Sequence, residues 1–231
     1  AIVHGGPFAN IAHGTASLLA IKTAQKLSEY TLVEAGFAAD LGGEKFLDIV
    51  CRVGDLYPKV AVLIATARAV QEGGIENLEQ HLKNLRNFGL NVVLCINRFD
   101  SDNNKTIRTI KQFALDHDLP FAETFVFQKG GAGGLELAKL VLKATSLPAE
   151  SQSRGGLKKP FADLHFTYNL NAPPQTKILQ LCQKIYGAKD VEYSDLAASQ
   201  LVQFGKLAKS FFICLAKTQY SFSDNPEIKG S

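Results

Sequence analysis

The segment that decides the fold is the first one, Ala1-Ile-Val-His-Gly-Gly-Pro-Phe-Ala-Asn-Ile-Ala-His-Gly14, which leads into a helical pattern over 15–29. Its apolar start predicts a strand, and apolar side chains recurring near every 3.6 residues predict the helix. A strand, a glycine-rich loop and a helix in this order aim backbone N–H groups at an anion. Asn10 and His13 add side-chain donors. The alternative is a tight connection with two structural histidines, His4 and His13.

Beyond this loop, apolar runs alternate with helical patterns. Such alternation indicates βαβ units, and we expect an α/β fold whose mostly parallel sheet has helices on both faces. The predicted strands are Tyr30–Val33, Val60–Ala65, Asn91–Ile96 and Phe121–Phe127. The predicted helices are Glu44–Cys51, Ile75–Phe88, Asn104–His117 and Leu135–Thr145, and a glycine-rich turn covers Gly130–Gly134.

The stretch Pro148–Pro160 is rich in Pro, Ser and Gly and is the best candidate for a domain boundary. We predict a main α/β domain over residues 1–150 and a small α/β subdomain over 151–207, with helices near 176–186 and 195–204. Residues 208–231 would return the chain to the main sheet through a strand at Phe211–Ala216.

The composition is that of an ordinary globular protein, with 46% hydrophobic and 20% charged residues among 231 and a formal net charge of +3. The basic residues are dispersed, so we expect no nucleic-acid partner, and no apolar run reaches membrane-spanning length. Cys51, Cys95, Cys182 and Cys214 lack metal-type spacing and are interpreted as reduced core thiols of a cytoplasmic protein. The chain has no Met and begins within an apolar run. We therefore expect it to be part of a longer protein.

Polar, charged or glycine residues follow each predicted strand. Because ligands of open α/β sheets bind beyond the carboxyl ends of the strands, these residues together predict a site for a polyanion. Each one alone is weak evidence, because an Arg or Lys after a strand is more often a solvated surface residue. In chain order they are His4, Gly5, Gly6 and Asn10; Glu34, Gly36, Asp40 and Lys45; Thr66 and Arg68; Asn97, Arg98 and Asp100; Gln128, Lys129, Gly130 and Gly131; and Lys217, Thr218 and Gln219.

Two of these strand ends have a sharper interpretation. Glu34 stands where nucleotide hydrolases place a carboxylate that holds Mg²⁺ beside the phosphates, and the alternative is a loop-bracing carboxylate. Asn97-Arg98-Phe99-Asp100 is similar to the base-reading Asn-Lys-x-Asp loop of that superfamily, and the alternative is a turn braced by Asn97. A Gly-x-x-x-x-Gly-Lys-Ser/Thr loop is absent from the sequence, and so are a Gly-x-Ser-x-Gly elbow and a dinucleotide fingerprint.

Several long motifs in order along the chain resemble the formate–tetrahydrofolate ligase family. The likeness covers essentially the whole sequence and begins with the His4–Gly14 loop. The matching segments are His4–Gly14, Glu34–Phe46, Ala65–Ala69, Glu76–Leu78, Ile96–Phe99, Lys129–Leu135, Ile185–Ala188, Val191–Ser194 and Ala216–Asp224.

The resemblance implies a P-loop-NTPase-like fold and ATP-dependent ligation of formate to tetrahydrofolate through formyl phosphate. The products are 10-formyltetrahydrofolate, ADP and phosphate. Members of the family use Mg²⁺, are activated by a monovalent cation such as K⁺ or ammonium, and assemble as homo-oligomers, either tetramers or dimers.

The resemblance also implies roles for the residues at the strand ends. His4, Gly5, Gly6, Asn10 and His13 would line the cavity near the phosphoryl and formyl groups. Glu34 and Asp40 would position Mg²⁺ or the folate amine, and Arg68 would offset phosphate charge. The nucleotide would be contacted by Asn97 and Arg98 and approached by Lys129, Gly130 and Gly131, while Lys217, Thr218 and Gln219 would close the site.

The chain also departs from the family pattern. The segment that carries the P-loop is missing upstream, the C-terminal part of the family is missing, and the stretch between Arg68 and Glu76 is short. We expect this segment alone to be inactive. The alternative function is that of a non-catalytic paralogue or fragment without a P-loop, with a binding or oligomerisation role.

Overall fold

The structure is a computed structural model that describes residues 8–9, 11–146, 164–205, 207–217 and 222–223. The chain divides into two compact units. Residues 57–164 and 220–231 form one, here called the sheet unit, and residues 1–56 and 165–219 form the other, here called the helical unit. The predicted strand at residues 1–3 and the predicted boundary at Pro148–Pro160 lie outside the described residues.

The sheet unit is built on three parallel strands in the spatial order β1-β2-β3. They are β1 (Val60–Ala65), β2 (Asn91–Asn97) and β3 (Phe121–Thr124). Ala65 lies opposite Ile96, and Asn97 lies opposite Thr124, so the carboxyl ends of the three strands are level at one end of the sheet. Continuous apolar runs of this kind are typical of parallel strands that are covered on both faces.

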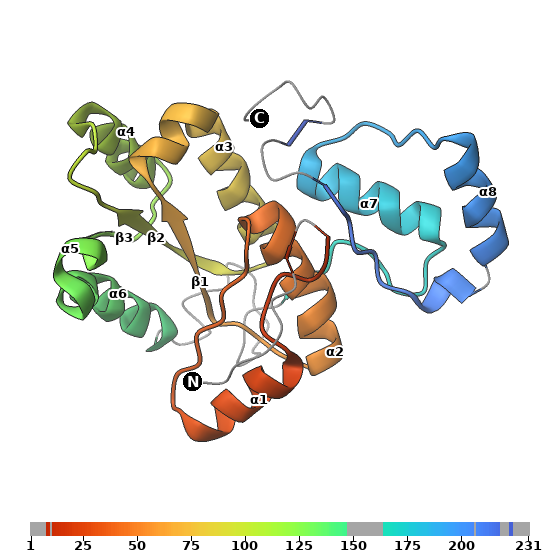
Figure 1. The fold of residues 1–231 in the computed structure, drawn as a ribbon, viewed down its shortest axis with the longest axis horizontal. Coiled ribbons are helices and arrows are strands. Elements are labelled where there is room, and N and C mark those ends of the chain that lie inside the picture. Colours follow the sequence, from red (N-terminus) through yellow and green to blue (C-terminus); the bar gives the residue numbers. More distant parts are fainter. Residues whose placement is uncertain (1–7, 10, 147–163, 206, 218–221, 224–231) are drawn as a thin grey trace. The chain divides into compact units, whose positions relative to one another are not determined.

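Helices cover both faces of this sheet (Figure 1). The helices α3 (Ala67–Asn87) and α4 (Asn104–Asp116) pack on one face, and α6 (Leu135–Ser146) packs on the other. Leu94, Ile96 and Ile110 are fully buried in the core between these layers. The predicted α/β fold with a parallel sheet is confirmed.

Two boundaries in the sheet unit differ from the prediction. The strand predicted to reach Phe127 ends at Thr124, because the Phe125 N–H donates to the Gly133 carbonyl and the chain turns into α5 (Val126–Lys129) and η3 (Gly130–Gly134). The helix predicted from Ile75 begins at Ala67, where the Thr66 hydroxyl caps it by accepting from the Ala69 N–H. A kink at Gly74, whose φ is 80°, interrupts α3.

The helical unit is organised around a continuous helical stretch at 39–54, which comprises η1 (Ala39–Gly43), η2 (Phe46–Cys51) and α2 (Arg52–Gly54). Both η1 and η2 are π-helical, a conformation that is rare and frequent at functional sites. Gly42 packs against the preceding loop so closely that a Cβ there would lie 2.1 Å from the Gly36 carbonyl oxygen. The unit also contains α1 (Leu18–Leu27), α7 (Pro174–Tyr186), α8 (Asp195–Phe204) and η5 (Leu207–Ser210).

Two strands predicted for this unit are wrong. Residues 30–33 run as an irregular segment with Leu32 exposed, and residues 211–216 form no strand either. In the second case, side chains replace the neighbouring strand as hydrogen-bond partners of the backbone. Lys177 Nζ donates to the Phe211 carbonyl, and the Ile213 N–H donates to the Tyr168 hydroxyl. The segment therefore lies in the helical unit instead of returning to the sheet.

The described sheet leaves one long edge uncovered by a strand. Among the described residues, β1 pairs only with β2, and its Ile64 side chain is 63% exposed. No helix in the described part of the chain is both long and apolar enough to cross a membrane.

Candidate functional site

The helical stretch at 39–54 buries an unusual number of charged side chains. Asp40, Glu44, Lys45 and Asp48 are each at most 5% exposed, and Arg52 follows Asp48 by one turn. Buried charges are costly unless they are paired or hydrogen-bonded, so each of them calls for a partner.

Asp40 is paired with Lys217, which belongs to the second of the two chain segments that form the helical unit. Lys217 Nζ lies 3.0 Å from Asp40 Oδ2, and the two residues are 177 positions apart in the sequence. Tyr186, the last residue of α7, contacts both partners of this ion pair. Its hydroxyl donates to the Asp40 carbonyl at 2.6 Å, and its ring centroid lies 5.3 Å from Lys217 Nζ.

Lys45 ties the glycine-rich loop to the same place. Its side chain is fully buried, and its Nζ donates to the Ala9 carbonyl. Burial lowers the pKa of Lys45, while the neighbouring Asp40 carboxylate acts in the opposite direction. The Gly14 carbonyl accepts from the Gly36 N–H at 3.1 Å, so the loop is bonded to the segment before η1 as well as to Lys45. Asp40, Lys45, Tyr186 and Lys217 are called the Asp40 cluster below.

Gly14 is needed where the loop folds back on itself. Its φ is +69°, and a Cβ there would lie 2.3 Å from the Cβ of Ala9. Ala9 itself is 1% exposed. The loop is therefore packed at Ala9 and Gly14, although Phe8 and Ile11 are exposed.

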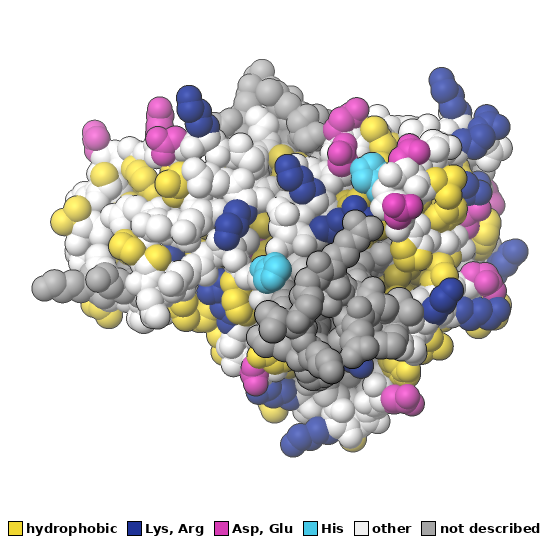
Figure 2. Space-filling model, turned by 180° about the vertical axis from the view of Figure 1, so that it is seen from behind, with side chains coloured by type: hydrophobic (Ala, Val, Ile, Leu, Met, Phe, Trp, Pro, Cys, Tyr) yellow, Lys and Arg dark blue, Asp and Glu magenta, His cyan; other side chains and the backbone are white. Residues whose placement is uncertain are grey.

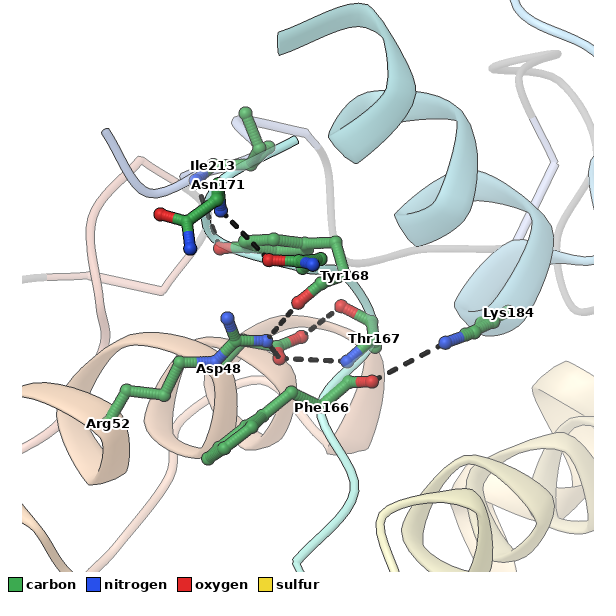
Figure 3. A network of polar contacts seen from close by, with 9 residues as sticks. Asp48, Arg52, Phe166, Thr167, Tyr168, Asn171, Lys184 and Ile213 are labelled. Carbon is green, nitrogen blue, oxygen red and sulfur yellow. Dashed lines mark hydrogen bonds and ion pairs between the residues drawn. The ribbon is translucent and has the colours of Figure 1, made fainter. Parts of the chain in front are cut away.

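A second buried network lies on the same helical stretch (Figure 3). Arg52 donates to Asp48 at 2.8 Å and to the Tyr168 carbonyl at 2.7 Å. Asp48 also accepts from the N–H of Thr167 at 3.0 Å and from its hydroxyl. The rings of Phe166 and Tyr168 lie 3.9 and 4.6 Å from the Arg52 guanidinium carbon. This network fixes residues 166–168 against η2 and α2, and Tyr168 in turn holds Ile213.

Glu44 lies between Asp40 and Asp48 in the sequence but forms no hydrogen bond with the Asp40 cluster or with the Asp48 network. It is fully buried, and neither carboxylate oxygen has a hydrogen-bond partner among the described residues. Burial, followed by the nearby Asp48 carboxylate, raises the pKa of Glu44 well above its ordinary value. Burial therefore favours the protonated form of Glu44 over the carboxylate.

In the sheet unit, the carboxyl ends of β2 and β3 bring a second set of predicted residues together. The Thr124 hydroxyl donates to Asn97 Oδ1 at 3.3 Å, and Gln128 donates to Asp100 at 2.7 Å. The exposed rings of Phe99 and Phe127 contact each other, with centroids 5.8 Å apart. The loop after β2 and the turn after β3 therefore form one surface with amide, carboxylate and aromatic groups.

Arg98 lies in this loop with its charge already compensated. Its guanidinium is paired with Asp102 at 3.2 Å and with Glu123, which is also paired with Lys111. Arg68 differs, because its side chain is 85% exposed and is paired at 2.9 Å with Glu72, whose side chain is 63% exposed. Lys129, Gly130 and Gly131 are exposed, and a Cβ on either glycine would have no atom within 4 Å.

Other predicted residues lie outside these groups. His13 is half-buried, and Glu34 is exposed. His4, Gly5, Gly6, Asn10, Thr218 and Gln219 lie outside the described residues. Cys214 is exposed, so its interpretation as a core thiol is wrong, whereas Cys51 and Cys95 are buried.

The sequence prediction missed Tyr186, Asp48, Arg52 and Tyr168. Tyr186 stands in one of the motifs that carry the family resemblance, but nothing in its local pattern points to Asp40. Asp48 and Arg52 follow Glu44 at intervals of four residues, which is the one local signal of a charged helix face.

On the face that Figure 2 shows, basic side chains are spread among acidic and apolar ones. The Asp40 cluster is different, because it holds two lysines and one carboxylate in a largely buried position beside a glycine-rich loop. An excess of ammonium groups with restricted hydration is suited to bind a phosphate or a carboxylate.

Comparison with known proteins yields a consistent result. The family model for formate–tetrahydrofolate ligase matches residues 1–231. Three relatives named formate–tetrahydrofolate ligase are each 40% identical to this chain over alignments of 249 or 250 positions, gaps included. They come from Parabacteroides distasonis, Caldicellulosiruptor saccharolyticus and Campylobacter concisus. The matches cover 99–100% of the chain but 43% of each relative, so the chain spans less than half the length of the curated relatives it matches.

Proposed function

The chain belongs to the formate–tetrahydrofolate ligase family, and from that premise we propose that it carries part of the active site for ATP-dependent ligation of formate to tetrahydrofolate. The reaction would proceed through formyl phosphate to 10-formyltetrahydrofolate, ADP and phosphate. The observation that carries the proposal is the Asp40 cluster, where Lys217 is paired with Asp40 and Lys45 is bonded to the buried Ala9 of the glycine-rich loop.

In this proposal, the helical unit binds the acyl and phosphoryl groups. Formate and formyl phosphate are anions, and phosphoryl transfer depends mainly on positioning and on charge stabilisation. Lys217 would stabilise the developing negative charge, and Asp40 would hold its ammonium group in place. Lys45 would hold the glycine-rich loop at Ala9 against the cluster through its hydrogen bond to the Ala9 carbonyl.

The sheet unit would bind the nucleotide. The Asn97 amide and the Asp100 carboxylate can together read a purine edge, and the exposed rings of Phe99 and Phe127 offer a face for stacking. The open turn at Gly130–Gly131 leaves room for a ligand. Arg98 would act by holding this loop in shape through Asp102 and Glu123.

The family resemblance implies Mg²⁺, which would need carboxylate ligands from this chain or from its substrates. Glu34 is exposed, and within the described ranges no three His, Cys, Asp or Glu side chains gather closely enough to hold a metal ion. Mg²⁺ in such enzymes is bound largely by substrate phosphates and water, so one carboxylate such as Glu34 would be a modest contribution. The described residues do not by themselves form the magnesium site.

Two broader properties are also part of the proposal. Assembly into a homo-oligomer follows only from the family resemblance. A cytoplasmic location is supported by the four free cysteines, since exposed thiols such as Cys214 persist in reducing compartments.

The proposal is tested with the full-length protein that contains this chain. We expect ADP release that requires both formate and tetrahydrofolate, and formation of 10-formyltetrahydrofolate. Lys217→Ala should lower kcat/KM for formate by about 10²-fold, as for the loss of a group that stabilises transition-state charge. Lys26→Ala, which removes an exposed lysine of α1, is the matched control. Absence of formate-dependent ADP release from the folded full-length protein would favour the non-catalytic alternative and overturn the proposal.

A further inference from the structure

Tyr186 has a position that neither the family motifs nor the proposed reaction explains. It ends α7, and its side chain extends to η1, which lies 146 residues earlier in the sequence. There the same side chain makes two different contacts, one through its hydroxyl and one through its ring. Each contact involves a different partner of the Asp40–Lys217 ion pair.

The hydroxyl contact fixes the backbone at Asp40. The phenol donates to the Asp40 carbonyl at 2.6 Å, at the start of a π-helical turn. This turn follows two non-glycine residues with positive φ, Phe37 at 57° and Ala38 at 67°, a conformation that needs support from its surroundings. A hydrogen bond to the first polar residue of the turn supplies such support and determines where the Asp40 carboxylate stands.

The ring contact concerns the ammonium group of Lys217. Its Nζ lies 5.3 Å from the ring centroid, within the range of a cation–π interaction. The side chains of Lys217 and Asp40 are 18% and 7% exposed, so this interaction is only partly weakened by water.

We infer that Tyr186 is a positioning residue, which clamps the Asp40–Lys217 ion pair and so restricts the Lys217 ammonium group to one position in the Asp40 cluster. The inference rests on the proposed function for the identity of the anion that Lys217 would bind, formate or formyl phosphate. The clamp itself is a property of this chain and can be measured without substrate.

The first test is therefore chemical labelling of Lys217, because an amine held in an ion pair and against a ring is less accessible to an acylating reagent than one that is free to move. The full-length protein is treated with an N-hydroxysuccinimidyl acetate at fixed pH, and acetylation of Lys217 is followed by mass spectrometry relative to Lys26. We expect Tyr186→Leu, which removes both contacts, to raise the relative labelling rate about fivefold, as expected from the loss of a partly desolvated cation–π contact. Tyr186→Phe keeps the ring but removes the hydrogen bond to the Asp40 carbonyl, and it should raise the rate about twofold.

Tyr193→Leu is the matched control, since it removes a half-buried tyrosine from the same unit, and its labelling should equal that of the wild type. An unchanged Lys217 labelling rate in folded Tyr186→Leu protein would overturn the inference. If Tyr186→Leu does not fold, Tyr186→Phe decides the question, and labelling identical to the wild type there overturns the clamp.

The second test uses steady-state kinetics. A clamp on Lys217 predicts that Tyr186→Leu raises KM for formate about tenfold, with a smaller change in kcat and in KM for ATP. A uniform fall in kcat with all KM values unchanged would show a loss of active protein and would contradict a positioning role. If the wild-type full-length protein has no ligase activity, the proposed function fails, while the labelling result still decides whether Tyr186 clamps Lys217.

Discussion

The sheet unit and the helical unit are stabilised in different ways. The sheet unit is held by a layer of fully buried aliphatic side chains such as Leu94, Ile96 and Ile110, and within the described residues it has no fully buried charged residue. The helical unit places Asp40, Glu44, Lys45 and Asp48 in its interior and joins distant segments through them. Apolar burial is non-directional, whereas buried ion pairs require defined partners and geometry. The helical unit therefore depends more strongly on single residues.

The largest expected effect is that of Asp48→Ala. The change leaves the Arg52 guanidinium, whose side chain is only 9% exposed, without its charge partner and removes the acceptor of Thr167. We expect a loss of about 4 kcal/mol in the free energy of unfolding, measured by urea denaturation. Arg68→Ala is the control, because it breaks an exposed ion pair and should leave stability unchanged within error. Equal effects of the two variants would contradict the difference between the units.

The next effect is that of Leu94→Ala in the sheet unit. Leu94 is fully buried at the centre of β2, and the variant should lose about 3 kcal/mol through lost burial and a residual cavity. Leu115→Ala on α4 is the control, since Leu115 is 61% exposed. Urea unfolding followed by far-UV circular dichroism checks both variants. A loss below that of Leu115→Ala would show that apolar burial in β2 does not stabilise the sheet unit.

Tyr168→Phe tests the contacts between side chains and backbone that replace a strand in the helical unit. The variant keeps the ring against Arg52 but leaves the Ile213 N–H without its acceptor. We expect a loss of about 1 kcal/mol. Hydrogen exchange at Ile213 should become faster, while Tyr193→Phe should leave it unchanged. Unaltered exchange at Ile213 in the Tyr168 variant would mean that this bond does not hold the segment at 211–217.

The smallest effect depends on pH and concerns Glu44. Its pKa is raised in the folded protein above the ordinary 4.5, so the folded state binds more protons than the unfolded state as pH rises above that value. This excess lowers the stability of the wild type with increasing pH through the interval up to the folded pKa. Glu44→Gln does not titrate, and its melting temperature relative to the wild type should therefore rise between pH 5 and pH 8. The exposed Glu29→Gln is the control, and a flat difference for Glu44→Gln would mean that burial does not raise the pKa of Glu44.

The same contrast explains how much of the fold could be predicted from the sequence. The limits of β1 and β2 were predicted to within one residue, because long aliphatic runs between helical patterns are a local signal. The apolar runs at Tyr30–Val33 and Phe211–Ala216 carry the same local signal but form no strand. Whether an apolar run pairs with another strand depends on partners elsewhere in the chain, which composition does not reveal.

The candidate site was predictable in part for a related reason. Asp40 and Lys217 were both proposed from their place after apolar runs, and the structure brings them into contact although the runs before them are not strands. Tyr186 could not be found in this way, since a tyrosine at a helix end has no local pattern that identifies its partner. The roles of Glu34, Arg68, Lys129 and Asn97 in binding stay predictions, and so does the division of the chain at residues 150 and 207.

The uncovered edge of β1 has a practical consequence for work with this chain. Val-Ala-Val-Leu-Ile-Ala at 60–65 is a charge-free, proline-free segment of strong β propensity, and its outer row of backbone N–H and C=O groups has no strand beside it within the described residues. Such segments are templates for intermolecular β pairing and fibril growth. Aggregation of the isolated chain on heating or concentration should therefore start at this hexapeptide, and a lysine in place of the exposed Ile64 is the substitution expected to suppress it.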